Sequence, residues 1–115
     1  MTALDLSLVI PVYNEEANVE PLYVELTEAL ADLGIDYEMV FVEDGSTDST
    51  LDELRSISNR DPRVQVLRFS RNYGQTAAIQ AGFAHAVGRT VVTMDGDLQN
   101  DPADIGRLLD RIGDG

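Results

Sequence analysis

Several residue types are missing from this 115-residue sequence, and each absence excludes a class of protein. There is no cysteine, which excludes a disulfide scaffold and a cysteine-ligated zinc or iron–sulfur site. No apolar run reaches the roughly 18 residues of a membrane-spanning helix. Residues 1–6 contain Asp5 and no arginine or lysine, so we expect no secretory signal peptide.

Lysine is also absent, and the charge is one-sided. Acidic residues number 21 against 8 arginines, and the net charge is −13. A surface this negative argues against DNA or RNA binding and against adhesion to anionic lipid. We therefore expect no nucleic-acid partner. Hydrophobic residues make up 43% of the chain, enough for the core of one domain.

The fold is predicted from alternating strand-like and helix-like segments. Short apolar, β-branched stretches predict strands at 6–12, 37–42, 64–69 and 90–94. Helical periodicity predicts helices at 19–33, 49–59, 75–87 and from 101 onward. Asn18 is the expected N-cap and Gly34 the stop of the first helix, and Asp101-Pro102 begins the fourth. The alternation predicts a Rossmann-like, doubly wound, mostly parallel α/β sheet with helices on both faces.

Polar clusters follow every predicted strand. Ligands of such sheets bind beyond the carboxyl ends of the strands, so we expect the clusters to converge on one edge. The clusters cover residues 13–16, 43–48, 70–74 and 95–99. Their carboxylates, aromatic rings and amides suit a nucleotide together with a divalent metal ion.

Asp95 and Asp97 carry the strongest chemical signal. Two carboxylates at this spacing, after a buried strand, can hold Mg²⁺ or Mn²⁺, which prefer oxygen ligands. Gly96 between them lets the backbone turn sharply. The alternative is a chance pair, because aspartate is common throughout the chain.

Asp44 is a candidate contact for a nucleotide base or ribose hydroxyl. We expect Ser46 to Ser49 to cap the following helix, whereas Asp44 binds ligand. Pro11 and Tyr13 can form a wall against a base face, since aromatic rings stack on bases. The alternative for Tyr13 is a core residue at a strand end.

Three further residues have competing interpretations. Glu15 lies at the mouth of the predicted cleft, or it is a solvated acid favoured by the helix dipole. Arg71 can meet a phosphate, or it forms a structural ion pair with a nearby carboxylate. His85, the only histidine, has no partner at ligand spacing and is expected on a helix surface.

Four segments together resemble glycosyltransferase family 2, in order and over almost the whole chain. They are LSLVIPVYNEEANV, FVEDGSTDST, SRNYGQTAAIQAGFAHA and TMDGDLQNDP. They look most like the polyprenyl-phosphate branch, which includes dolichol-phosphate mannosyltransferase and bactoprenol glucosyltransferases. The resemblance implies a GT-A fold and transfer of a sugar, with inversion, from a UDP- or GDP-sugar to a polyprenyl phosphate.

The resemblance also implies roles for individual residues. Pro11, Tyr13 and Glu15 match positions around the nucleotide, and Asp44 matches the acid that contacts base or ribose. Glu43 departs from the aspartate more usual there and stays outside the predicted site.

The metal site and the catalytic pair follow from the same resemblance. Asp95 and Asp97 match the D-x-D metal ligands, and the resemblance implies that they are the catalytic residues. Asp95 also matches a position that borders the nucleotide. Gln99 matches the amide that completes the shell of Mg²⁺ or Mn²⁺. The cation would neutralise the departing diphosphate.

Family members are longer than this chain. We therefore expect residues 1–115 to be the nucleotide-sugar-binding part of a GT-A domain, truncated at the C-terminus. Such a part can bind a nucleotide without catalysing transfer by itself. Acceptor residues and any membrane segments would lie beyond it, with the whole protein at the cytoplasmic face of the membrane. An exposed sheet edge can pair with another copy and give a homo-oligomer.

Other functions remain open at this stage. They are a family 2 transferase with a saccharide acceptor, a nucleotidyltransferase, and a non-catalytic nucleotide-binding fragment. A phosphorelay receiver domain needs a lysine that this chain lacks. A dinucleotide-binding dehydrogenase domain needs G-x-G-x-x-G after the first strand, where VYNEE stands instead.

Overall fold

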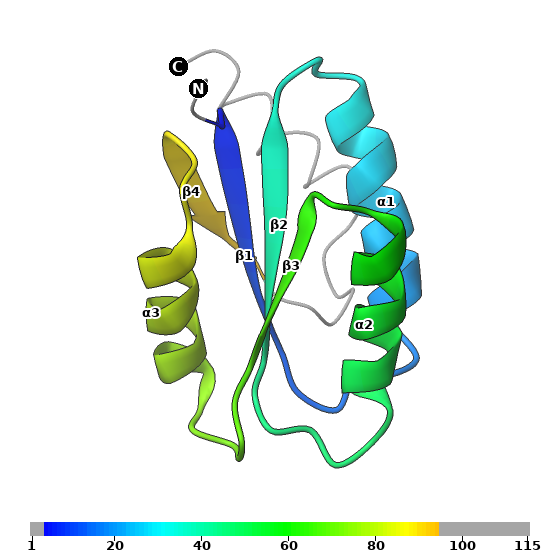
Figure 1. The fold of residues 1–115 in the computed structure, drawn as a ribbon, viewed down its shortest axis with the longest axis vertical. Coiled ribbons are helices and arrows are strands. Elements are labelled where there is room, and N and C mark those ends of the chain that lie inside the picture. Colours follow the sequence, from blue (N-terminus) through cyan, green and yellow to red (C-terminus); the bar gives the residue numbers. More distant parts are fainter. Residues whose placement is uncertain (1–3, 95–115) are drawn as a thin grey trace.

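In the part of the chain that the structure describes, a four-stranded parallel sheet forms the centre of the fold. The computed structural model describes residues 4–94. Strands and helices alternate along the chain in the predicted order (Figure 1). The elements are β1 (Leu6–Val12), α1 (Val19–Ala31), β2 (Tyr37–Glu43), α2 (Thr50–Arg60), β3 (Val64–Arg68), α3 (Gln75–His85) and β4 (Thr90–Thr93).

The strand order is β3-β2-β1-β4, and every pair is parallel. The chain first adds β2 and β3 on one side of β1 and then crosses over to place β4 on the other side. The order therefore reverses between β1 and β4. In Figure 1, α1 and α2 cover one face of the sheet and α3 covers the other. This is the predicted doubly wound α/β fold, and ligands of such folds bind at the carboxyl edge near the reversal.

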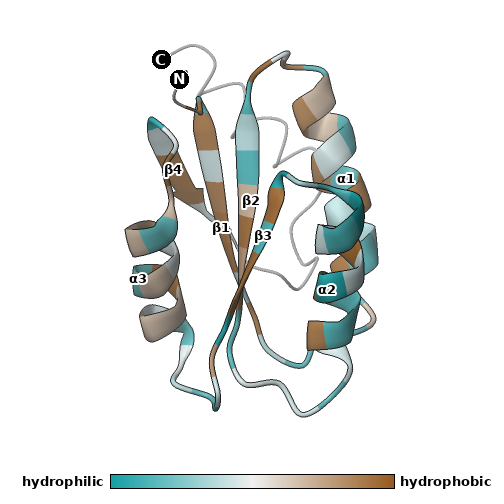
Figure 2. Cartoon of the chain, viewed as in Figure 1, coloured by the Kyte–Doolittle hydropathy of each residue, from teal (hydrophilic) through white to brown (hydrophobic). Residues whose placement is uncertain are grey.

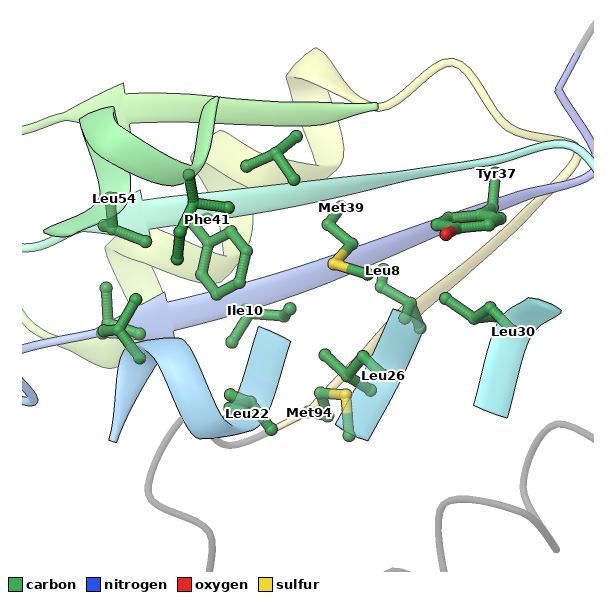
Figure 3. Packing of buried hydrophobic residues seen from close by; sticks show 14 of the residues in the cluster. Leu8, Ile10, Leu22, Leu26, Leu30, Tyr37, Met39, Phe41, Leu54 and Met94 are labelled. Atoms are coloured by element: carbon green, nitrogen blue, oxygen red, sulfur yellow. The ribbon is translucent and has the colours of Figure 1, made fainter. Parts of the chain in front are cut away.

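Most of the core lies between the sheet and the two helices α1 and α2. Apolar side chains of β1 and β2 point at one stripe of α1 (Figure 3). The labelled residues include Leu8, Ile10, Met39 and Phe41 on the strands and Leu22, Leu26 and Leu30 on α1. Burying each such side chain stabilises the fold by about 1.5–3 kcal/mol. Figure 2 shows that the exposed side of α2 is mostly hydrophilic, as this packing requires.

The α3 side of the sheet is packed through small residues. A Cβ atom on Gly82 would lie 2.3 Å from Cγ1 of Val9. Ala78, one turn earlier, is fully buried against Val9, Val40 and Val42. Helix α3 therefore lies close against the sheet.

Several element ends differ from the prediction. The second strand extends to Glu43, and the third and fourth each end one residue early, at Arg68 and Thr93. The first helix ends at Ala31, because Leu33 N–H bonds Leu30 O in a tighter turn before Gly34 at φ +63°. The third helix ends at His85 because Ala86 is extended. His85 is exposed, as expected.

The predicted helix from residue 101 lies outside the described residues. Within residues 4–94, no helix combines the length and apolar character needed to cross a bilayer.

Candidate functional site

Three loops meet at the carboxyl edge of the sheet, at the lower end of Figure 1. The first loop, 13–18, follows β1; the second, 44–49, follows β2; the third, 69–74, follows β3. Together they are called the edge platform. β4 reaches the same edge, where Met94 N–H donates to Val9 O at 3.1 Å. The predicted ligands that come next, Asp95, Asp97 and Gln99, lie outside the described residues.

Asn14 joins the first loop to the second. Its backbone N–H donates to Ser46 Oγ at 2.9 Å, and its side-chain Oδ1 accepts from Thr47 N–H at 2.8 Å. Its φ of +53° places it in the left-handed region, which asparagine tolerates better than most residues. The predicted capping role of Ser46 is therefore wrong, because its hydroxyl serves this connection between loops.

A second set of bonds joins the same loops at the start of α2. Glu15 N–H donates to Thr50 Oγ1 at 2.8 Å, and Ser49 N–H donates to Glu16 Oε2 at 3.1 Å. Asp48 accepts from Thr50 N–H at 2.9 Å, so Asp48 makes the capping bond, whereas Ser49, the N-cap residue, makes no side-chain cap bond.

The hydrogen bonds to Asp48 also favour its charged form. Burial disfavours its charged form, but donation from the hydroxyl and amide of Thr50 and the amide of Glu16 outweighs this, and the pKa of Asp48 is lowered.

Asp44 joins the second loop to the third. Its side chain is almost fully buried, with the residue 4% exposed. The carboxylate accepts from Tyr73 N–H at 2.8 Å, Gly74 N–H at 3.0 Å and Asn72 Nδ2 at 3.0 Å. These donors hold the third loop against the end of β2. The predicted contact of Asp44 with base or ribose stays a prediction; the structure adds a scaffolding role that its position after a strand did not reveal.

Gly45 lets these two loops touch. Its φ is +73°, and a Cβ atom there would lie 2.2 Å from the backbone C of Arg71 and 2.4 Å from Asn72 N. No side chain fits in this gap, so glycine is required both by the turn and by the close approach.

Glu43 was left out of the predicted site, and the structure gives it a supporting role. The residue is 2% exposed, and its Oε1 accepts from Ser46 N–H at 2.6 Å. A longer acid than aspartate at the end of β2 thus shapes the turn that carries Asp44. The glutamate that stands here in place of the family's more usual aspartate was the one feature of the sequence that could have indicated this supporting role.

Pro11 lies two residues beyond Val9, which forms the last described pair between β1 and β4, with Thr93. Val9 O accepts from Met94 N–H on the β4 side, whereas Val12 O accepts from Asp44 N–H on the β2 side. The alternation places the nitrogen of Pro11 on the β4 side, and proline has no N–H with which to continue that ladder. Proline is therefore compatible with this otherwise central strand.

Tyr13 and Glu15 are accessible at the edge platform. Tyr13 is 44% exposed, so its alternative placement in the core is wrong. Glu15 Oε2 accepts from Asn18 Nδ2 at 2.7 Å, which fixes this carboxylate beside the start of α1. Asn18 is the N-cap residue as predicted, but its side chain bonds Glu15 rather than capping the helix. The nucleotide contacts of Pro11, Tyr13 and Glu15 stay predictions.

Arg71 lies on an aromatic support. Its guanidinium carbon is 4.8 Å from the ring centroid of Tyr73, and Tyr73 meets Phe69 edge-to-face at 5.5 Å. Among residues 4–94, no carboxylate oxygen lies within 4.0 Å of this guanidinium, so the described region holds no ion pair for it. Within residues 4–94, Tyr73 therefore orients this charge and no carboxylate neutralises it. Tyr73, 53% exposed, was not among the predicted site residues.

The described part of the chain contains no cluster of three or more histidine and acidic side chains arranged to hold a metal ion. The carboxylates of Asp95 and Asp97 and the amide oxygen of Gln99 are hard donors of the kind that Mg²⁺ and Mn²⁺ take. Their arrangement is not described, so the metal site stays a prediction.

Comparison with known proteins identifies the family. The sequence model of glycosyl transferase family 2 matches residues 7–115, and the chain belongs to this family. It is 44% identical over 111 residues to dodecaprenyl-phosphate galacturonate synthase of Rhizobium johnstonii, covering 96% of this chain and 33% of that protein. It is 46% identical over 110 residues to undecaprenyl-phosphate 4-deoxy-4-formamido-L-arabinose transferase of Pseudomonas aeruginosa, covering 95% and 32%. The chain thus spans about a third of the length of these relatives.

Solved structures confirm the fold. Glucosyl-3-phosphoglycerate synthase from Mycobacterium tuberculosis, in complex with Mn²⁺, uridine diphosphate and phosphoglyceric acid, superimposes with a TM-score of 0.73 at 25% identity. The match covers 97% of this chain and 40% of that one. The predicted GT-A type of α/β fold and the predicted family are both confirmed.

Proposed function

We propose that residues 1–115 are the nucleotide-sugar-binding part of an inverting transferase that moves a sugar from a UDP- or GDP-sugar to a polyprenyl phosphate. The observation that carries this proposal is the identity of 44–46%, over 95–96% of the chain, to two relatives named for polyprenyl-phosphate products or acceptors. Because the chain covers only about a third of each relative, the acceptor side of the reaction belongs to the whole protein.

The edge platform supports the donor half of this proposal. Its loops are fixed to one another by hydrogen bonds, so a ligand meets a preorganised surface at the carboxyl edge of the sheet. Tyr13 offers an exposed ring for a base, and Glu15 borders the same loop. Arg71, supported by Tyr73, offers charge-assisted hydrogen bonds to a diphosphate.

The metal belongs beside this platform in the proposal. Asp95, Asp97 and Gln99 would hold Mg²⁺ or Mn²⁺, since they follow β4 at the edge where the strand order reverses. The bound cation would supply Lewis-acid stabilisation of the departing nucleoside diphosphate. The solved structure with Mn²⁺ and uridine diphosphate supports a divalent metal in this fold.

Activation of the acceptor needs little help from side chains in this part of the chain. A polyprenyl phosphate is already anionic near neutral pH, so its oxygen needs little help from a general base. We place the whole protein at the cytoplasmic face of a membrane, where such a lipid can be reached. The relatives' named acceptors support this placement.

Calorimetric titration of the chain with UDP and with GDP, each with and without Mn²⁺, tests the donor half. We expect one nucleotide to bind only with Mn²⁺, and Asp97→Ala to lose that binding. Asp52→Ala, at an exposed acid in the first turn of α2, is the matched control and should bind normally. Folded chain that binds neither nucleotide, or Asp97→Ala that binds as well as the parent, contradicts the proposal.

A further inference from the structure

A groove runs along the outer edge of the sheet, between α2 and β3, and shares no residue with the edge platform. Its volume is about 300 Å³. It is lined by Leu51, Arg55, Ser58, Asn59, Gln65, Val66 and Arg68. Figure 1 shows α2 lying alongside β3, which is the last strand on this side of the sheet.

The backbone of β3 is open toward this groove over part of its length. Arg63 O accepts from Met39 N–H and Phe69 N–H donates to Glu43 O, so odd-numbered residues of β3 bond with β2. The backbone N–H and C=O groups of the even-numbered residues of β3 therefore point away from β2, toward the outer edge of the sheet.

One of these outward residues is already bonded. Val64 donates its N–H to Asp61 O and accepts from Ser58 Oγ. Within residues 4–94, the outward backbone groups of Val66 and Arg68 have no such partner, so the open edge is confined to the stretch that borders the groove.

Two arginines of the groove also have no acidic partner among the described residues. Arg60 pairs with Glu20 at 2.8 Å and Arg63 pairs with Asp61 at 3.1 Å. In the described part of the chain, neither Arg55 nor Arg68 has a carboxylate within 4.0 Å, although the whole sequence holds 21 acidic residues. The groove is thus a basic site on an acidic protein.

We propose that this groove binds an extended acidic polypeptide segment, which adds to β3 as a further strand and places carboxylates against Arg55 and Arg68. An added strand pairs with the outward backbone groups of Val66 and Arg68. Alternate side chains of an extended segment face the same side. An acid at every second position can therefore face Arg55 and Arg68 on the α2 side of the sheet, while the residues between the acids face the opposite side.

Charge favours this occupant over the others. A second copy of the chain would bring its own Arg68 to the shared edge, and two chains of net charge −13 repel each other. A free anion or a lipid headgroup would satisfy the arginines but not the open backbone of β3. Only an acidic polypeptide satisfies both.

Two blocked peptides test the proposal, acetyl-VEVEVT-amide and acetyl-VKVKVT-amide, titrated into the isotopically labelled chain at low ionic strength. We expect the acidic peptide to bind at least about tenfold more tightly than the basic one and to weaken as salt screens the charges. The amide resonances of Val66 and Arg68 should shift. N-methylation of the alternate peptide amides that face β3 should abolish binding, whereas N-methylation of the other set should not.

Substitutions locate the site. Arg55→Gln and Arg68→Gln should each weaken the acidic peptide by about three- to tenfold. Arg89→Gln is the matched control, because Arg89 is exposed at the opposite, amino edge, where its N–H bonds Leu4 O. Nucleotide binding at the edge platform should be unchanged by all three substitutions.

Several outcomes overturn the proposal. Equal binding of both peptides, or no binding of the acidic peptide to the folded chain, excludes an acidic strand. If the groove binds inorganic phosphate or phosphatidylglycerol vesicles, if this binding depends on the arginines, and if the acidic peptide does not bind, the groove is a site for an anion or a membrane. Dimerisation that Arg68→Gln changes assigns it to a second copy.

Discussion

The carboxylate of Asp44 accepts a hydrogen bond from the backbone N–H of Tyr73, 29 residues further along the chain, at 2.8 Å. The same side chain accepts from Gly74 N–H and Asn72 Nδ2. One buried acid thus fixes the third loop of the edge platform relative to β2. The exposed ring of Tyr73 and the guanidinium of Arg71 that lies over it depend on this connection for their position.

Removing the Asp44 carboxylate should destabilise the fold. Asp44→Ala removes the acceptor of the Tyr73 and Gly74 amides, and a hydrogen bond to a charged group contributes about 1.5–3 kcal/mol. We expect the free energy of unfolding in urea to fall by about 2–4 kcal/mol. Asp44→Asn keeps one acceptor oxygen and should lose less. Asp52→Ala, at an exposed position, should stay within about 0.5 kcal/mol of the parent; an equally mild Asp44→Ala would show that the bonds contribute little.

Substitutions at two glycines with positive φ can distinguish the cost of backbone strain from the cost of a steric clash. Gly34 has φ +63° with nothing within 4 Å of a built Cβ, whereas the Cβ at Gly45 would meet the backbone of Arg71. Gly34→Ala should cost about 1–2 kcal/mol from strain alone. Gly45→Ala should cost about 1–3 kcal/mol more, because two loops must separate. Equal losses in urea unfolding would mean that the third loop moves away freely.

Asp61 should make stability depend on acid pH. Burial disfavours its charge, but the Arg63 side chain and amide and the Tyr23 hydroxyl, which donates at 2.8 Å, hold the pKa of Asp61 below its usual value. Because the folded pKa is lowered, the stabilisation is present above the unfolded pKa, 3.8, and is lost as pH falls through the folded pKa.

The variant Asp61→Asn tests this dependence. It should lower the unfolding free energy at neutral pH by about 1–3 kcal/mol and flatten its decline in acid. Urea unfolding at several pH values measures both effects, with Asp52→Asn as the exposed control. A variant whose acid decline is as steep as the parent's would exclude Asp61 as its source.

Arg71 should contribute to nucleotide affinity. Arg71→Gln removes a charge-assisted contact to phosphate and should weaken metal-dependent nucleotide binding about tenfold. Arg89→Gln makes the same charge change at the amino edge of the sheet and should leave the affinity within about twofold. Calorimetry measures both, and equal losses would attribute the effect to overall charge instead of a contact at the edge platform.

The fold was largely readable from the sequence because strand and helix patterns are local. β1 was predicted at its observed bounds, and the alternation of strands and helices predicted the parallel, doubly wound sheet. The supporting contacts of the site were not readable. Asn14 with Ser46, and Gly45 against Arg71, join residues that are far apart in the chain, and only the parallel sheet brings them together. The polar residues that follow the strands therefore predicted where the site lies. They did not predict which of these residues bind one another and which remain free to bind a ligand.

The most direct test of a nucleotide site on the edge platform is a titration of the isotopically labelled chain with UDP and with GDP in the presence of Mg²⁺, followed by backbone amide resonances. We predict that one nucleotide shifts the amides of residues 13–18, 44–49 and 69–74, while those of the groove between α2 and β3 stay in place. Saturable binding whose shifts fall elsewhere, or no shift from either nucleotide in the folded chain, would contradict a donor site on this platform.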